Sequence, residues 1–144
     1  MAKALIVYAS RTGETETIGN LIAEGIRFCG HEANVVKVTD IKKEDDLKGH
    51  DALVFGSPTY HGEMVQGMKT LLFMAEQAGL EDKVGGAFGS FGWSGEAPDH
   101  IFDTMKNIFK MKMVSIPLRL KSAKLGGGIK MAQDYGREIA EKLA

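Results

Sequence analysis

The chain has 144 residues, of which 44% are hydrophobic and 26% charged, which is typical of a globular protein large enough to bury a core. Its 18 basic and 19 acidic residues give a net charge of -1, which excludes the basic bias that nucleic-acid binding requires. Cys29 is the only cysteine, so an intrachain disulfide is excluded and a reducing compartment is expected. Without a membrane-spanning run or a signal peptide, we expect one cytoplasmic domain over residues 1–144, with no membrane contact.

Short apolar runs alternate with longer amphipathic segments along the chain. Strands are expected at residues 4–8, 33–38, 52–55, 84–89 and 113–120. Apolar residues recur at helical spacing over residues 18–29, 64–78, 101–109 and 132–143, which predicts four helices. Cys29 lies on the apolar stripe of the first helix, so we expect it in the core. Pro117 lies inside the last strand and lacks a backbone donor, which favours an edge position for that strand.

Five strands alternating with helices predict an α/β fold, namely a three-layer, doubly wound, five-stranded parallel sheet. The first and third strands are the most apolar, and the second and fifth are expected at edges, which favours the strand order 2-1-3-4-5. Ligands of such sheets bind beyond the carboxyl ends of the strands, at the switch point between strands one and three. The loops 9–15, 57–62 and 90–96 all follow strand ends, so we expect them at this edge.

The first of these loops places three hydroxyl residues, Ser10, Thr12 and Thr15, around a single glycine. The N-terminus of the helix that follows has unpaired backbone N–H groups and partial positive charge, which suits a phosphate. The alternative interpretation is that the hydroxyls only cap the helix, which requires just one of them. The loop by itself leaves both interpretations open.

The second and third loops each carry a large aromatic residue, Tyr60 and Trp93, with glycine within two residues. Core packing explains such aromatics poorly, although each can instead fold back on the protein as a lid. Two aromatic platforms beside a phosphate site indicate a flat aromatic ligand with a phosphate tail.

Three segments, at residues 10–15, 56–60 and 89–96, now resemble a known family. Their sequences, SRTGET, GSPTY and GSFGWSGE, are similar to the three FMN-binding loops of short-chain flavodoxins. The second and third are most similar to the flavodoxin domain of flavo-diiron proteins, and we expect this domain to stand alone here, without a diiron module. The resemblance spans essentially the whole chain and implies a flavodoxin-like fold.

The resemblance also implies that the protein is a low-potential electron carrier that binds FMN and shuttles between its semiquinone and hydroquinone states. The expected cofactor-binding residues are Ser10, Arg11, Thr12, Gly13, Glu14, Thr15, Ser57, Pro58, Thr59, Tyr60, His61, Gly62, Ser90, Phe91, Gly92, Trp93, Ser94, Gly95 and Glu96. Redox proteins are the implied partners, and we expect a monomer with neither catalytic residues nor a metal. The alternative is an FMN-dependent NAD(P)H:quinone reductase of the same fold.

Two details follow for the loops. The family implies a peptide flip at His61–Gly62, and glycine at the third turn position makes a change from type I to type II sterically easy, so Gly62→Ala should weaken the neutral semiquinone. His61 either tunes the flavin or faces solvent. Arg11 is the only cation of the first loop, and we expect it to point to solvent while neutral dipoles hold the phosphate.

Other classes that share parts of this pattern lack their key residues. A receiver module needs an aspartate after the third strand, where Gly56 stands. A low-molecular-weight phosphatase needs a cysteine in the first loop, and Cys29 lies outside it. A Walker-type NTPase needs a lysine there, and the loop has none.

Overall fold

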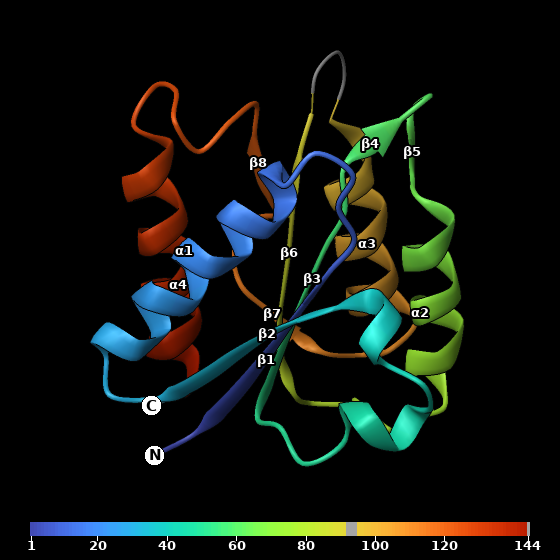
Figure 1. Cartoon of the computed structure of the whole chain (residues 1–144). Helices are drawn as coiled ribbons and strands as arrows, with labels where there is room; N and C mark the ends of the chain where they lie inside the picture. Colours follow the sequence, from blue (N-terminus) through green and yellow to red (C-terminus); the bar gives the residue numbers. More distant parts are fainter. Residues whose placement is uncertain (92–94, 144) are drawn as a thin grey trace.

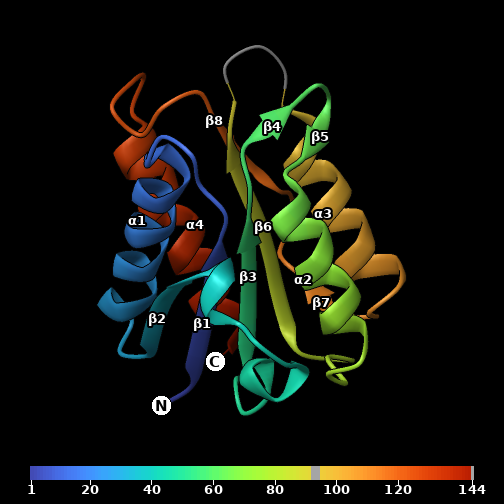
Figure 2. The same cartoon turned by 45° about the vertical axis from the view of Figure 1, so that its right-hand side comes forward.

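The computed structural model describes residues 1–91 and 95–143. A parallel sheet forms the middle layer, with α1 and α4 on one face and α2 and α3 on the other (Figures 1 and 2). The helices are α1 (Glu14–Phe28), α2 (Gln66–Glu76), α3 (Glu96–Asn107) and α4 (Gly128–Leu143). The charged segment after β2 forms two short 3-10 helices, η1 (Val38–Asp40) and η2 (Glu44–Leu47).

The sheet has the predicted order. Its strands are β1 (Lys3–Tyr8), β2 (Glu32–Lys37), β3 (Ala52–Gly56), β6 (Val84–Ser90), β7 (Lys112–Met113) and β8 (Leu118–Leu120). They are arranged as β2-β1-β3-β6, and both β7 and β8 then pair with β6 in parallel. The order 2-1-3-4-5 is therefore confirmed, with the fifth position shared by two short strands. A separate antiparallel hairpin consists of β4 (Thr59–Tyr60) and β5 (Glu63–Met64).

The expectation of one continuous strand over residues 113–120 is wrong. Pro117 has no N–H to donate, so the ladder with β6 stops after β7 and resumes only at β8. The hydroxyl of Tyr135, from α4, occupies the gap: it accepts from Ala87 N at 3.2 Å and donates toward the carbonyl oxygen of Ile116 at 2.8 Å. Burial raises the pKa of Tyr135, so the group remains a neutral hydroxyl.

Cys29 also differs from its expected position. Helix α1 ends at Phe28, and Cys29 is its exposed C-cap residue rather than a core residue. The chain turns away at Gly30, whose φ of +88° is the left-handed conformation in which helices commonly end. The apolar spacing of α1 therefore continues past the end of the helix, where Cys29 no longer faces the sheet.

The sheet is buried on both faces, as its continuous apolar runs predict. Along β1, Leu5 and Val7 pack toward α2 and α3, whereas Ile6 packs toward α1 and α4. Gly136 of α4 allows close contact with α1, because an added Cβ would overlap the carbonyl oxygen of Ile22. This packing positions α1 so that its N-terminus lies at the carboxyl edge of the sheet. Within residues 1–91 and 95–143, no helix is long and apolar enough to cross a membrane.

Candidate functional site

The first loop, the β4–β5 hairpin and the end of β6 lie at the carboxyl edge of the sheet (Figure 2). Among them lies a cavity of about 240 Å³. It is lined by Thr12, Glu14, Pro58, Thr59, Tyr60, Ser90, Phe91 and Lys121. Two larger cavities, of about 360 and 380 Å³, are lined by other residues. The smaller cavity is lined by residues from all three of the predicted loops, so we take it as the candidate site.

The first loop leaves the N-terminus of α1 without a side-chain cap. The N-cap residue is Gly13, with φ of +90°, and it has no side chain that could accept a hydrogen bond. The Ser10 hydroxyl instead accepts from Gly13 N at 2.9 Å and so stabilises the loop before the helix. The interpretation that the hydroxyls only cap α1 is therefore wrong. The first-turn N–H groups have no acceptor within the helix, which suits an anion at this position.

Thr15 and Ser90 connect the two sides of the cavity. Their hydroxyl oxygens are 2.9 Å apart, and both side chains are buried. This bond holds the first turn of α1 against the end of β6. It uses one of the two hydroxyl hydrogens, so a second donor is present at the pair.

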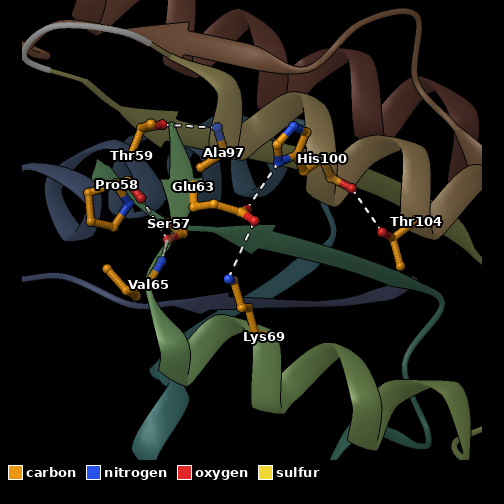
Figure 3. A network of polar contacts seen from close by, with 9 residues as sticks. All are labelled: Ser57, Pro58, Thr59, Glu63, Val65, Lys69, Ala97, His100 and Thr104. Carbon is orange, nitrogen blue, oxygen red and sulfur yellow. Dashed lines mark hydrogen bonds and ion pairs between the residues drawn. The ribbon is translucent and has the colours of Figure 1, made fainter. Parts of the chain in front are cut away.

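By contrast, the Ser57 and Thr59 hydroxyls, which the sequence predicts as cofactor ligands, are bonded to backbone groups of the protein (Figure 3). The Ser57 hydroxyl accepts from Val65 N at 3.1 Å and donates to the carbonyl oxygen of Pro58 at 2.9 Å. Ala97 N, in the first turn of α3, donates to the Thr59 hydroxyl at 2.9 Å. These bonds fix the position of the hairpin relative to α2 and α3.

The base of the hairpin is also held by charges. Glu63 lies 3.2 Å from His100 Nδ1 on α3 and 3.4 Å from Lys69 Nζ on α2 (Figure 3). The hydrogen bond with His100 and the neighbouring Lys69 hold the pKa of Glu63 below its ordinary value. All three side chains are well exposed to solvent, so each pair contributes little to stability.

The tip of the hairpin is not the expected type I turn. Its two central residues, His61 and Gly62, both have positive φ, of 54° and 76°, which in a two-residue hairpin is the type I′ turn. This turn matches the right-handed twist of the two strands, and that twist overrides the preference of histidine for negative φ. A change from type I to type II therefore does not start from this conformation. His61 is exposed.

Arg11 does not simply point to solvent, as the sequence suggested. Its guanidinium lies over the ring of Tyr60, 4.9 Å from the centroid, which is within the range of a cation–π interaction. The contact joins the first loop to the hairpin, whose Tyr60 lines the cavity. Arg11 is therefore already paired with an aromatic ring.

The third loop is described only at its two ends. Phe91 N donates to the carbonyl oxygen of Leu120 at 3.2 Å, and Phe91 lines the cavity. Gly95 is the N-cap residue of α3, and Glu96 is its first residue. The predicted contacts Gly92, Trp93 and Ser94 lie outside the described residues, so stacking by Trp93 stays a prediction.

Lys121 lines the cavity but was not among the predicted site residues. It follows Leu120 directly, at the carboxyl end of β8. The rule that ligands bind beyond strand ends applies to this position too. The position of Lys121 at a strand end is therefore a signal that the sequence itself contains.

Comparison with known proteins assigns the family. The flavodoxin family model matches residues 6–141. The chain belongs to the flavodoxin family. Flavodoxins bind FMN, and FMN is the cofactor of this chain. A solved flavodoxin from the domain Archaea is 32% identical, with a TM-score of 0.92 over 98% of both chains.

Curated relatives include larger proteins. The flavo-diiron protein FprA2 of Clostridium acetobutylicum is 31% identical and the putative diflavin flavoprotein A 6 of Nostoc sp. is 30% identical, each over 96% of this chain. The chain spans only 36% and 25% of the lengths of these relatives. An NAD(P)H dehydrogenase (quinone) of Rhodopseudomonas palustris is also 30% identical, over 82% of this chain and 71% of the relative.

The residues of the cavity suit FMN. The uncapped N-terminus of α1 and the exposed Thr12 hydroxyl supply donors for a phosphate. Tyr60 and Phe91 supply aromatic surface in the same cavity, as a flat ring system requires.

Proposed function

We propose that this flavodoxin is an FMN-dependent carrier that passes electrons between redox proteins. The observation that carries the proposal is the cavity itself, in which the N-terminus of α1 and the aromatic ring of Tyr60 face one space at the edge of the sheet. The 32% identity to a solved flavodoxin, with a TM-score of 0.92, supports a carrier.

The roles of the individual residues follow from their positions. Thr12 and the first-turn N–H groups of α1 bind the phosphate, and Tyr60 packs against the ring. Bound FMN supplies the group that accepts and releases electrons. The bonds of Ser57 and Thr59 keep the hairpin in one position as the charge on the ring changes, which keeps the reorganisation small.

The proposal includes the surroundings in which the carrier works. Residues 1–144 form one FMN-binding domain that acts as a monomer in the cytoplasm. Its partners are redox proteins, and it contacts neither nucleic acid nor a membrane. With a net charge of -1, long-range steering toward strongly charged partners is weak.

A second candidate function is an NAD(P)H:quinone reductase. The observation that favours it is the 30% identity to the dehydrogenase of Rhodopseudomonas palustris. In that function the same cavity would hold FMN, and the open side of the ring would receive the nicotinamide and then the quinone.

The two functions differ in turnover. The purified protein, loaded with FMN, should show flavin absorption in the visible range and release FMN on denaturation. It should reduce or oxidise a one-electron protein partner stoichiometrically. With NADPH and a quinone in steady state, we expect no sustained turnover. Sustained turnover that disappears in the FMN-free protein would establish the reductase and contradict the carrier.

A further inference from the structure

Lys121 brings a cation to the lining of the cavity, which does not include Arg11 of the first loop. We propose that Lys121 is a binding residue for the phosphate of FMN, a role that rests on the proposed function. The side chain lines the cavity together with Thr12 and Glu14, the residues on either side of the N-cap of α1. It comes from a segment more than a hundred residues further along the chain.

The sheet places Lys121 near the first turn of α1. In the parallel pair of β6 and β8, Ser90 is aligned with Leu120, so Lys121 is one residue beyond this pair. Ser90 is in turn hydrogen-bonded to Thr15 in the first turn of α1, at 2.9 Å. Two contacts therefore join the strand end that carries Lys121 to the helix start that receives the phosphate.

Lys121 is the cationic side chain of the cavity lining that can contact a phosphate. Glu14 lines the cavity and would repel a phosphate, which carries roughly −1.5 to −2 charges at neutral pH. Arg11 lies over the Tyr60 ring. Lys121 is exposed and, among the residues that the structure describes, forms no ion pair or hydrogen bond through its side chain.

A neighbouring residue on the same strand shows the contrast. Arg119 lies 3.3 Å from Asp99 on α3 and is therefore already paired. An unpaired ammonium beside a helix N-terminus and a carboxylate offsets the repulsion between Glu14 and an incoming phosphate. It also adds a charge-assisted hydrogen bond to the neutral donors of the loop.

The test compares FMN with riboflavin, which has the same ring and no phosphate. Both are titrated into the FMN-free protein, with binding followed by quenching of flavin fluorescence. We expect Lys121→Gln to weaken FMN binding by about fivefold, as for a partly exposed charge pair of about 1 kcal/mol, and to leave riboflavin binding unchanged. Lys121→Arg should retain FMN binding. Lys124→Gln, which changes an exposed lysine of the same loop outside the cavity lining, is the matched control and should bind as the wild type does.

The salt dependence gives a second readout. The affinity of the wild type for FMN should fall more steeply with added KCl than that of Lys121→Gln, because salt screens the pair. An equal loss for FMN and riboflavin, or the same loss in Lys124→Gln, would overturn the assignment to the phosphate. Unchanged FMN binding in Lys121→Gln would overturn it as well. A wild type that does not bind FMN would instead contradict the proposed function.

Discussion

The first loop and the β4–β5 hairpin both line the same cavity, yet they use their hydroxyl groups differently. Ser57 and Thr59 of the hairpin are buried, and each is bonded to backbone groups of neighbouring elements. Thr12 of the first loop is exposed, and its hydroxyl has no partner in the part of the chain that the structure describes. The hairpin hydroxyls therefore determine the shape of the site, whereas Thr12 remains available to a ligand.

The backbone beneath the two regions differs in the same way. At the base of the hairpin, Gly89 of β6 lies so close that an added Cβ would overlap the carbonyl oxygen of Ser57 and come within 2.8 Å of Pro98 Cγ. At Gly13, in the first loop, an added Cβ would meet no atom within 4 Å. One side of the cavity is closely packed and the other is open.

The largest effect should come from the closely packed side. Gly89→Ala should lower the free energy of unfolding by about 3 kcal/mol, because the backbone at Ser57 and the ring of Pro98 must move to admit one methyl group. Gly13→Ala should lower it by only about 1 kcal/mol, the cost of a positive φ in open space. Urea unfolding followed by circular dichroism measures both. Equal losses in the two variants would show that the hairpin base is not closely packed.

The next effect concerns the hydroxyls. Ser57→Ala should lower the free energy of unfolding by about 2 kcal/mol, because the N–H of Val65 loses its acceptor. Thr12→Ala is the matched change in the open loop and should alter stability by less than about 0.5 kcal/mol. The same urea titration serves for both variants. A larger loss for Thr12→Ala would contradict the proposed division of roles.

Ligand binding should show the reverse order. Thr12→Ala should weaken FMN binding by about fivefold through the loss of one hydrogen bond to the phosphate. Arg11→Ala should weaken it less, because the Arg11 guanidinium contacts the Tyr60 ring. Isothermal titration of the FMN-free variants gives the two affinities. If Arg11→Ala has the larger effect, the guanidinium leaves Tyr60 and binds the phosphate.

The smallest effect is the pH dependence of the hairpin base. The pKa of Glu63 is lower in the folded protein than its ordinary value of 4.5. The Glu63 carboxylate therefore stabilises the fold at pH values above 4.5, and this stabilisation is lost as the pH falls through the lowered pKa of the folded protein. The difference in unfolding free energy between wild type and Glu63→Gln should therefore be present at neutral pH and disappear in acid. Added salt should reduce it at neutral pH. A difference that persists in acid would mean that His100 and Lys69 are not its cause.

Much of the fold could be predicted from the sequence because the signals are local. Continuous apolar runs identified the strands buried on both faces, and their relative hydrophobicity predicted the order of the sheet. Local signals failed where a backbone feature interrupted or ended an element before its apolar pattern did. Pro117 interrupts the last strand where Tyr135 fills the gap, and Cys29 follows the apolar period of α1 beyond the end of the helix.

The sequence by itself determined which loops meet at the edge of the sheet, since strand order decides which strand ends are neighbours. It also identified the family through the residues of those loops. Only the tertiary structure decided which hydroxyls bond to the protein's own backbone, as the Thr59 hydroxyl does to Ala97 N. It also decided that Arg11 contacts the Tyr60 ring. It also added Lys121 to the cavity. Such pairings depend on the distance between segments far apart in the chain, and hydrophobic periodicity contains no information about that distance.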